Sequence, residues 1–477
     1  MNGGTAPRIP VSARDADIVG LTADSRAVKP GYLFAALSGS RTDGKRFIAD
    51  AIAKGAAAIL TDADEPPETR VPVIVDANPR RRLALMAARF YAPQPKTIAA
   101  VTGTNGKTSV TVFLRQIWQL LGRKAASFGT IGVVAPGFER PGSLTTPDPV
   151  ALHRDLHELA RLGVDHVALE ASSHGLDQFR LDGLSLTAAA FTNLTRDHLD
   201  YHRDMEAYFT AKARLFTEIL PKGGAAVFNI DSSYTARLSM LARARGLRVL
   251  TYGRNPAADL WLSDALPEGL GQRIRVSGFG EKRDVVVPLL GAFQAYNALA
   301  AAGLAIGCGA PAASVLDQIA ALTGVPGRMQ RIGDAPVLVD YAHTPDALET
   351  ALNALRPFAT GKLIVVFGCG GDRDAGKRPQ MGAIAEKLAD RAIVTDDNPR
   401  SEDPALIRRA ILAASPKAQE IGDRAAAIHA AIGMMTLGDV VLIAGKGHER
   451  GQIIGNQTLP FDDAEVARAA LSGKGSA

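Results

Sequence analysis

The feature that most constrains the fold is a repeated alternation of two kinds of segment. Short runs of β-branched residues that end in Gly or Asp alternate with stretches rich in Ala, Leu and Arg. This pattern is typical of βαβ units, in which helices connect neighbouring strands of a parallel sheet. We therefore expect an α/β fold. At 477 residues the chain is too long for one compact core, so several domains are expected.

Two breaks divide this alternation into three predicted domains. The segment Ala92-Pro93-Gln94-Pro95 follows a predicted strand and its helix, and Val325-Pro326-Gly327 interrupts a helical stretch. Pro and Gly are the strongest markers of such breaks. We predict an N-terminal domain, a central domain and a C-terminal domain over residues 1–93, 94–329 and 330–477.

The C-terminal domain has the clearest pattern of strands. Four predicted strands are separated by helical segments, which indicates a doubly wound, Rossmann-like unit. These strands cover residues 336–342, 362–368, 391–396 and 440–444.

Composition narrows the classes of function. Lys and Arg number 54 against 49 Asp and Glu, and no basic run is interleaved with aromatic residues, so we expect no nucleic-acid partner. The two cysteines, Cys308 and Cys369, lie far apart, which predicts neither a disulfide framework nor a zinc site and indicates a reducing compartment. No window approaches ~20 consecutive apolar residues. We expect a cytoplasmic protein without membrane insertion.

The strongest local motif is the run Gly103-Thr104-Asn105-Gly106-Lys107-Thr108, which lies between a predicted strand at 97–101 and a helical stretch at 109–121. Backbone N–H groups in such a loop bind phosphates, together with the positive end of the following helix. The lysine reaches the terminal phosphates and the threonine hydroxyl contacts Mg²⁺. Val101 stands where the full pattern has its first Gly. The motif predicts an ATP or GTP site, and the alternative is an ordinary glycine turn.

Two polar groups follow later strands of the central domain. Glu170 ends a strand, at the sheet edge where open α/β sheets bind ligands, and is suited to a metal contact. The alternative is a carboxylate that caps the next turn through Ser172 or Ser173. His198 belongs to the loop 197–202, which is dense in oxygen and nitrogen ligands. A solvated polar loop is the alternative there.

Lys212 lies on the apolar face of a predicted helix. Apolar residues at three- and four-residue spacing define that face, among them Tyr208, Leu215 and Phe216. One interpretation is snorkelling, in which the stem is covered and the ammonium reaches water. The other is functional, because a desolvated lysine loses its proton more readily and a neutral amine can add carbon dioxide. The resulting carbamate is an oxygen ligand for a metal.

Polar loops follow the predicted strands of the C-terminal domain and would line one edge of its sheet. They cover residues 340–343, 370–374, 397–400 and 445–449. Mixed acids and arginines suit a zwitterion, because Arg pairs with a carboxylate while an acid accepts from an ammonium. The glycine-rich run at 368–371 lacks the third Gly of a dinucleotide-binding motif. We therefore predict a small-molecule site, and ordinary surface loops are the alternative.

Taken in order along nearly the whole chain, these motifs resemble those of the Mur ligases. The resemblance rests on the phosphate loop Gly103 to Thr108, the Thr145-Thr146-Pro147-Asp148 turn, Glu170 to Gly175, Phe191 to His202, Lys212, Gly327 to Met329, Asp340 to Asp346, and Gly445 to Glu449. It implies an N-terminal domain for a uridine nucleotide, a P-loop-type central ATPase domain and a C-terminal amino-acid domain. The Asp397-Asn398-Pro399-Arg400 loop resembles the version that accepts diaminopimelate rather than lysine.

The resemblance implies an ATP-dependent amide ligase of peptidoglycan synthesis, and hence a part in cell wall biogenesis, cell shape and cell division. Such an enzyme joins meso-diaminopimelate to UDP-N-acetylmuramoyl-L-alanyl-D-glutamate through an acyl phosphate, with Mg²⁺ as cofactor and carbon dioxide held as a lysine carbamate. We expect a monomer. The alternatives are a lysine-adding Mur ligase, a folylpolyglutamate-synthase-like ligase and a P-loop switch that binds nucleotide without catalysis. The segment Asp24-Ser25-Arg26 and the Asn-Pro-Arg loop argue against the second.

The resemblance also implies roles for individual residues. Catalysis would depend on Lys107, Glu170, His198 and Lys212, and the metal ligands would be Thr108, Glu170, His198 and carbamylated Lys212. ATP would be bound by Gly103, Thr104, Asn105, Gly106, Lys107, Thr108, Asn297, Arg328 and Asp340. The UDP-sugar dipeptide would be bound by Ser25, Thr145, Thr146, Ser172, Gln178 and Arg180. Diaminopimelate would be bound by Arg373, Asp397, Asn398, Pro399, Arg400, Gly445 and Glu449. One departure is Gln294, where the family usually has Asn.

Overall fold

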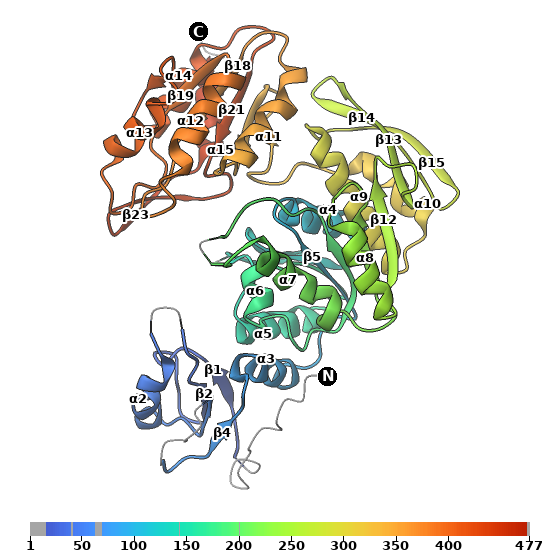
Figure 1. Ribbon diagram of the computed structural model, residues 1–477, viewed down its shortest axis with the longest axis vertical. Coiled ribbons are helices and arrows are strands. Elements are labelled where there is room, and N and C mark those ends of the chain that lie inside the picture. The colour runs from blue at the N-terminus through green and yellow to red at the C-terminus, as the bar shows by residue number, and fades with distance from the viewer. Residues whose placement is uncertain (1–15, 40–41, 63–68, 143, 200, 475–477) are drawn as a thin grey trace. The chain divides into compact units, whose positions relative to one another are not determined.

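The computed structural model describes residues 16–39, 42–62, 69–142, 144–199 and 201–474 (Figure 1). Asp200, a member of the predicted polar loop, lies outside the described residues. Internal contacts divide the chain into two compact units. The first runs to Lys107 and continues over Trp118–Leu250 and Gly307–Gly309, whereas the second holds Thr108–Ile117, Thr251–Ile306 and the chain from Ala310 onward.

A four-stranded parallel sheet opens the first unit. Its order is β1 (Gly20–Thr22), β2 (Tyr32–Ala35), β3 (Ala58–Thr61) and β4 (Val73–Val75). One apolar cluster joins the sheet to α2 (Ile48–Ala53) and another joins it to α3 (Pro79–Phe90). Helix α3 begins after Asn78, whose side chain accepts from the backbone N–H of Arg81, and Pro79 occupies the first turn.

The first unit also contains the parallel sheet that follows the N-terminal domain. Its parallel strands run in the order β11 (Ala225–Asn229), β10 (Leu186–Phe191), β5 (Thr97–Thr102), β9 (His166–Glu170) and β6 (Ala125–Gly129). The antiparallel strands β7 (Gly132–Ala135) and β8 (Phe138–Arg140) extend it beyond β6. The further helices of this unit are α5 (Pro149–Arg161), α6 (Ser173–Asp177), α7 (Met205–Arg214) and α8 (Thr235–Ala244). Helix α4 (Lys107–Leu120) begins in the first unit, and its residues Thr108–Ile117 belong to the second.

The position of the candidate active site follows from the topology of this sheet. Its parallel strands are buried almost without interruption, as expected when both faces are covered. Parallel neighbours end at the same edge, so β5, β9 and β10 bring together the phosphate loop, Glu170 and the loop that begins at Thr192. Three motifs that are distant in sequence therefore meet at one edge.

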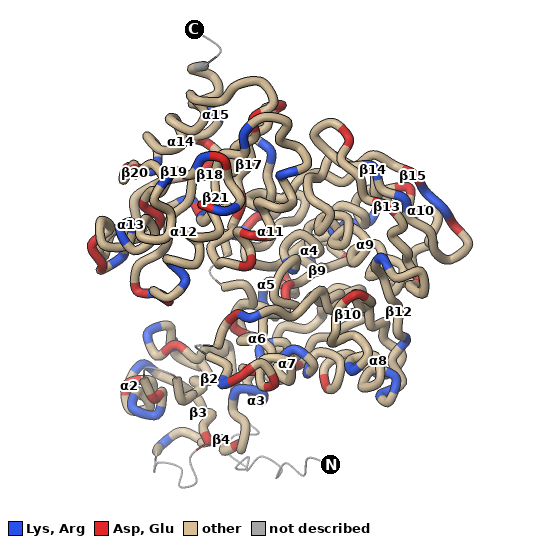
Figure 2. The backbone as a smooth tube through the Cα atoms, turned by 45° about the horizontal axis from the view of Figure 1, so that its top comes forward, with Lys and Arg blue, Asp and Glu red and all other residues tan. Residues whose placement is uncertain are grey.

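The expected alternation of strands and helices is interrupted in the second unit. There β13 (Leu260–Glu268), β14 (Gly271–Gly278) and β15 (Glu281–Val287) form an antiparallel meander, and β13 pairs in parallel with the end of β12 (Arg248–Gly253). The two-residue turn at Phe279 and Gly280 has φ of 54° and 84°, as a type I′ hairpin turn requires. Charged side chains pair across the meander, for example Arg273 with Glu268 and Asp284. Figure 2 shows basic and acidic positions along these strands. The continuous βα alternation predicted for the central domain is wrong over these strands.

A six-stranded sheet forms the core of the C-terminal part. Its order is β16 (Gln330–Arg331), β17 (Val337–Asp340), β21 (Val440–Ala444), β18 (Leu363–Phe367), β19 (Arg391–Val394) and β20 (Gln419–Glu420). All pairs are parallel except β16 with β17. The four predicted strands are present, and the sequence analysis missed the two short edge strands and the hairpin of β22 (Gly451–Ile454) and β23 (Gln457–Pro460).

Helices cover both faces of this sheet. Alternate residues of β18 enter opposite apolar clusters, since Leu363 belongs to one cluster and Ile364 to the other. The first cluster includes α11 (Pro345–Leu355), α12 (Lys377–Leu388) and α13 (Pro404–Leu412), and the second includes α14 (Arg424–Gly433) and α15 (Asp463–Lys474). This arrangement confirms the doubly wound unit.

The remaining helices are α9 (Ala292–Gly307) and α10 (Ala312–Asp317), with short 3₁₀ turns at Gly44–Phe47, Ile319–Ala321 and Arg356–Phe358. A π-helical turn at Leu215–Ile219 directly follows α7. Within the described residues, no helix is both long and apolar enough to span a membrane.

A fully buried ion pair ties two helices of the C-terminal sheet together. Arg424 at the start of α14 donates from Nε and Nη2 to the two carboxylate oxygens of Asp463, each at 2.7 Å, and neither side chain is exposed. The same Nη2 donates to the Ala444 carbonyl oxygen at the end of β21. A buried bidentate pair of this kind is costly to break on one side, because the remaining charge stays desolvated.

We predict that Asp463→Asn lowers the free energy of unfolding by about 3–5 kcal/mol, since Arg424 would lose its compensating charge. Urea unfolding followed by circular dichroism measures this difference. Glu206→Gln is the control, because it removes only an exposed ion pair with Arg237 and should change stability little. An Asp463→Asn variant as stable as the parent would show that the pair contributes nothing.

Candidate active site

The phosphate loop connects β5 to α4 and is fixed by the segment that follows β10. Thr104 donates from its backbone N–H to the Asn193 carbonyl oxygen at 2.9 Å, and the Thr192 hydroxyl donates to the Asn105 carbonyl oxygen at 2.6 Å. A Cβ at Gly103 would lie 1.9 Å from the Thr192 hydroxyl oxygen, so this position requires glycine. The loop is preformed, with the N-terminus of a long helix at its end.

Two lysines share one carbonyl oxygen in this loop. Lys107 Nζ donates to Gly103 O at 3.0 Å and to Thr104 O at 2.8 Å. Lys212 Nζ donates to the same Gly103 O at 2.8 Å, and lies 4.5 Å from the centre of the Tyr208 ring. The structure therefore brings Lys107 and Lys212 together, although they are far apart in sequence.

The environment of Lys212 disfavours its charged form. The side chain is 1% exposed, so its amine does not reach water and the snorkelling interpretation is wrong. Burial lowers the pKa of Lys212 well below its usual value, the positive charge of Lys107 lowers this pKa further, and Asp197 opposes the shift. Burial and the neighbouring cation thus both act in favour of the neutral amine.

Glu170 projects from the end of β9 and is held by Thr130. Its Oε1 accepts from the Thr130 backbone N–H at 2.8 Å and its Oε2 accepts from the Thr130 hydroxyl at 3.2 Å. A Cβ at Gly129 would lie 1.9 Å from Oε1, so the carboxylate packs directly on that glycine. Ser172 caps the next helix with its own hydroxyl, which accepts from the backbone N–H of Gly175. The alternative interpretation of Glu170 as a cap for this turn is wrong.

His198 lies in an aromatic group next to α6 and α7. Its backbone is in the left-handed region, with φ of 54°, and its backbone N–H donates to Asp197 Oδ1 at 2.8 Å. The His198 ring centre is 5.1 Å from that of His174 and 6.1 Å from that of Tyr208. The side chain is 45% exposed. His198 thus reaches solvent on one side and contacts buried rings on the other.

Most residues predicted for the UDP-sugar dipeptide form one connected group. The Thr146 hydroxyl donates to the Glu170 carbonyl oxygen at 2.8 Å and accepts from the backbone N–H of Ser172 at 3.0 Å. Arg180 donates to the Thr146 carbonyl oxygen at 2.6 Å and to Gln178 Oε1 at 2.7 Å. Burial lowers the pKa of Arg180. The group is linked to the backbone of Glu170 through the Thr146 hydroxyl.

Thr145 also belongs to this group, because its hydroxyl lies 3.1 Å from that of Thr130. Ser25 stands apart in the turn after β1, where its carbonyl oxygen accepts from Lys54 Nζ at 2.8 Å. Among the described residues, no hydrogen bond connects Ser25 with the group around Thr146.

Three residues predicted for ATP gather around Gln294. The Gln294 amide accepts from Asn297 Nδ2 at 3.0 Å and donates to the Arg328 carbonyl oxygen at 3.3 Å. Asp340 Oδ2 accepts from the backbone N–H of Met329 at 2.6 Å, and burial raises the pKa of Asp340 against the effect of Arg328. Gln294, which stands where the family usually has Asn, therefore links Asn297 to the segment that contains Arg328.

Residues predicted for diaminopimelate meet at the C-terminal sheet edge. Asn398 Nδ2 donates to Glu449 Oε2 at 2.8 Å, although the two residues belong to loops after different strands. A Cβ at Gly445, where φ is 116°, would lie 2.6 Å from Asp397 Oδ2. The loops after β19 and β21 are thus packed against each other through these side chains.

Arg400 lies at the rim of this group. Its backbone has φ of 52°, and its Nη1 donates to the Gly371 carbonyl oxygen at 2.9 Å. Within the described residues its side-chain hydrogen bonds all run through Nη1. Pro399 is buried, whereas Arg373 is exposed and donates to the Asp372 carbonyl oxygen at 3.1 Å. Arg373 lies in the loop after β18, the same loop whose Gly371 contacts Arg400.

Sequence reasoning missed three residues that organise these sites. Thr130 holds Glu170, Tyr208 contacts both the Thr104 hydroxyl and Lys212, and Lys446 contacts Asn398 and Glu449. The contact between Tyr208 and Lys212 could have been predicted, because Tyr208 precedes Lys212 by four residues and so lies on the same helix face. The contact of Thr130 could not, since its partner lies 40 residues away in the chain.

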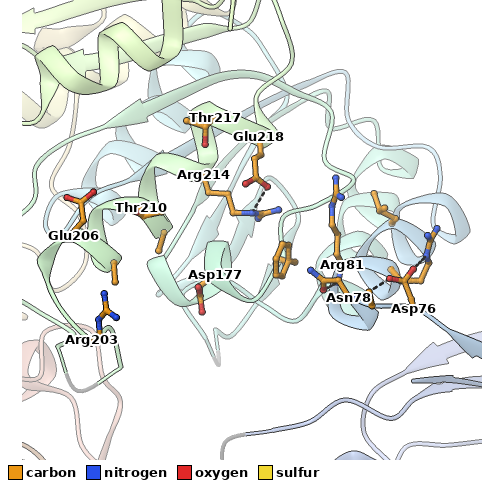
Figure 3. A pocket seen from close by; sticks show the side chains of 16 residues that line it. Asp76, Asn78, Arg81, Asp177, Arg203, Glu206, Thr210, Arg214, Thr217 and Glu218 are labelled. Carbon is orange, nitrogen blue, oxygen red and sulfur yellow. Dashed lines mark hydrogen bonds and ion pairs between the residues drawn. The ribbon is translucent and has the colours of Figure 1, made fainter. Parts of the chain in front are cut away.

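A cavity of about 830 Å³ lies along α3 and α7 (Figure 3). None of the predicted site residues lines it. Its lining on α7 includes Glu206, Thr210 and Arg214, which share one face of that helix, while Lys212 projects from the opposite face. Its charges are largely paired within the protein, for example Arg214 with Glu218 and Arg82 with Asp76. The cavity is therefore separate from the candidate active site.

The donors for a metal are mixed in type. Within the described ranges, no group of three His, Cys, Asp or Glu side chains is arranged to hold a metal ion. The hydroxyl of Thr108, the carboxylate of Glu170 and the imidazole of His198 nevertheless lie in segments that follow β5, β9 and β10. Oxygen-rich donors of this kind fit Mg²⁺, which keeps several waters and uses few protein ligands.

Comparisons with known proteins match the same family in three successive segments of the chain. A model of the Mur ligase family catalytic domain matches residues 17–91, one of the Mur ligase middle domain matches 101–305, and one of the Mur ligase glutamate ligase domain matches 327–447. The UDP-N-acetylmuramoyl-L-alanyl-D-glutamate--2,6-diaminopimelate ligase of Bradyrhizobium diazoefficiens is 56% identical over 464 residues, which cover 96% of each chain.

Solved structures agree as well. A structure of a UDP-N-acetylmuramoyl-L-alanyl-D-glutamate--2,6-diaminopimelate ligase is 36% identical with a TM-score of 0.72, and the match covers 96% of this chain and 95% of that one. A folylpolyglutamate synthase of Mycobacterium tuberculosis has a TM-score of 0.64 at 19% identity, covering 82% of this chain and 94% of that one, and so shares the fold. From the identity to the first relative over nearly its full length, this chain belongs to the Mur ligase family.

Proposed function

We propose that the chain is an ATP-dependent ligase that adds meso-diaminopimelate to UDP-N-acetylmuramoyl-L-alanyl-D-glutamate in peptidoglycan synthesis. The relatives that carry this activity in their names support the proposal at 52–56% identity. The single observation that carries it is the Gly103 carbonyl oxygen, which accepts from Lys107 and from the buried Lys212. This arrangement joins a phosphate-binding lysine to an amine that is suited to carbamylation.

Charge balance favours a carbamate on Lys212. Two ammonium groups on one carbonyl oxygen would repel each other in a site from which water is excluded. Adding carbon dioxide to the neutral Lys212 amine forms a C–N bond and releases the amine proton to solvent. The product is an anion beside the Lys107 cation, which replaces repulsion with attraction.

The proposed chemistry begins with ATP. Lys107 and the backbone N–H groups of the loop bind its phosphates and orient the γ-phosphoryl group toward the D-glutamate carboxylate. Thr108, Glu170, His198 and the Lys212 carbamate are the proposed ligands of Mg²⁺, which when bound neutralises the charge that develops on the transferred phosphoryl group. Arg328, Asn297 and Asp340 hold the rest of the nucleotide. The D-glutamate carboxylate takes the γ-phosphoryl group to form an acyl phosphate, and ADP leaves. The amine of diaminopimelate then attacks the acyl phosphate and loses a proton, which forms the amide and releases phosphate.

The two other substrates have separate sites in this proposal. Thr145, Thr146, Ser172, Gln178 and Arg180 bind the UDP-sugar dipeptide. The hydrogen bond from the Thr146 hydroxyl to the Glu170 carbonyl oxygen connects this group to the end of β9, which supports a position of the dipeptide carboxylate near the phosphate loop. Ser25 contributes from the N-terminal domain. In the C-terminal domain, diaminopimelate is bound by Asp397, Asn398, Gly445 and Glu449 on the side of an ammonium group and by Arg373 and Arg400 on the side of a carboxylate.

We infer a three-domain organisation over residues 1–93, 94–329 and 330–477, one domain for each substrate. The family matches at 17–91, 101–305 and 327–447 support these boundaries. A cytoplasmic monomer fits substrates that are themselves made inside the cell.

We predict that Lys212→Ala nearly abolishes phosphate release, because the variant has no amine to carbamylate. A small added carboxylate such as formate should partly restore turnover by supplying an anion next to Lys107. Steady-state rates with ATP, Mg²⁺ and both other substrates measure the effect. Lys222→Ala is the control, since Lys222 is exposed. Full activity of the Lys212→Ala variant would refute the role.

The proposed function predicts that phosphate release requires both the UDP-sugar dipeptide and meso-diaminopimelate, and that lysine is a poor substitute. Arg400→Ala should raise the KM for meso-diaminopimelate by roughly thirty-fold to several-thousand-fold, because a charge-assisted contact costs about 2–5 kcal/mol when lost. The KM for ATP and for the dipeptide should change little. The measurement is kcat/KM for both amino acids in parent and variant.

Arg409→Ala is the matched control, since Arg409 is an exposed residue of α13 in the same domain. Phosphate release without an amino acid would favour the nucleotide switch. A parent that uses lysine as well as diaminopimelate would favour the lysine-adding ligase, and an unchanged preference in Arg400→Ala would remove Arg400 as the selector.

A further inference from the structure

Lys446 is a fully buried lysine at the candidate amino-acid site, in the loop after β21. Its side chain has no exposed surface. Its Nζ lies 3.1 Å from Asn398 Oδ1, 3.0 Å from Glu449 Oε2 and 2.6 Å from the Gly451 carbonyl oxygen. An ammonium has three N–H donors, so each of them has an acceptor. Lys446 therefore joins the loops after β19 and β21 to the first strand of the β22–β23 hairpin.

These contacts fix the orientation of the Asn398 amide. Asn398 Oδ1 accepts from Lys446 Nζ and also from the backbone N–H of Ile453 at 2.9 Å. The reversed amide would point its NH₂ group at two donors, which is unfavourable. With the oxygen fixed in this way, Nδ2 donates to Glu449 Oε2 at 2.8 Å. Lys446 thus orients the Asn398 amide so that its NH₂ group, and not its oxygen, faces Glu449.

The same contacts prepare Glu449 for a ligand. Its Oε2 accepts from both Lys446 and Asn398, and among the described residues its Oε1 has no side-chain hydrogen bond. The Glu449 side chain is 33% exposed, so the group is partly open to solvent. A carboxylate held through one oxygen, with the other oxygen available, is suited to accept from an ammonium.

We propose that Lys446 is a positioning residue for the amino-acid substrate. It orients the Asn398 amide, and with that amide it holds Glu449 Oε2, so that Glu449 Oε1 is left to accept from the ammonium at the far end of diaminopimelate. Lysine carries an ammonium at its far end too, whereas the extra carboxylate belongs to diaminopimelate alone. Lys446 therefore supports binding of the ammonium, and Arg400 supplies the selection for the carboxylate. This assignment rests on the proposed function.

The test compares Lys446→Met with the parent in steady-state kinetics. The KM for meso-diaminopimelate should rise at least about tenfold, because one partner of a buried charged pair is removed, while the KM for ATP and for the UDP-sugar dipeptide stays within about twofold. Inhibition by lysine should weaken by a similar factor, so the preference between the two amino acids is kept. Arg400→Ala should instead change that preference. Lys446→Arg keeps the charge and should recover part of the affinity.

A second variant distinguishes an effect of Lys446→Met on protein stability from an effect on the orientation of Asn398 and Glu449. Lys446→Met leaves the Glu449 carboxylate without its buried partner, so the double variant Lys446→Met/Glu449→Gln should regain thermal stability without regaining affinity for diaminopimelate. Lys417→Met is the control, since it removes an exposed Lys–Glu pair in the same domain.

Three outcomes would overturn the proposal. A folded Lys446→Met variant with the parent KM for meso-diaminopimelate would show that Lys446 does not position the site. An equal rise in KM for all three substrates would show a general structural role. A parent that releases no phosphate with meso-diaminopimelate would remove the proposed function itself, whereas the first two outcomes leave that function intact.

Discussion

The central site depends on one carbonyl oxygen that accepts from two lysines. Gly103 O lies at the end of β5, where Lys107 reaches back from the start of α4 and Lys212 reaches in from α7. Burial and then the positive charge of Lys107, which is itself partly exposed, lower the pKa of Lys212. A glycine that tolerates φ of 147° makes this approach possible. The chemistry of the site follows from this crowding of positive charge.

The parallel sheets explain why distant motifs meet. In the first unit, β5, β9 and β10 end at one edge and deliver the phosphate loop, Glu170 and the loop that begins at Thr192. In the C-terminal sheet, the loops after β19 and β21 meet in the same way. Each site also contains a buried lysine, Lys212 in one and Lys446 in the other. Their surroundings differ, because Lys446 pairs with Glu449 whereas Lys212 lies beside the cation Lys107.

Much of this organisation could be predicted from local sequence. Apolar periodicity placed Lys212 on a buried helix face, and the β-branched runs marked the four main strands of the C-terminal sheet. The antiparallel meander at 260–287 was missed. The alternation of more and less exposed positions along Glu281–Val287 is seen only in the structure. Contacts between distant segments could not be read in advance, because a residue such as Thr130 shows no pattern until the sheet places it beside Glu170. The role of Lys446 was hidden for the same reason, since Asn398 lies 48 residues away in the chain.

The most direct measurement is carbon-13 NMR of the enzyme in ¹³C-bicarbonate, with Lys212→Arg as the reference. The two-lysine arrangement predicts one carbamate signal in the parent that is absent from the variant, and that grows and fades with bicarbonate in step with turnover. A parent that turns over at full rate and shows no carbamate signal would contradict the account, because Lys212 would then act as an unmodified amine beside Lys107.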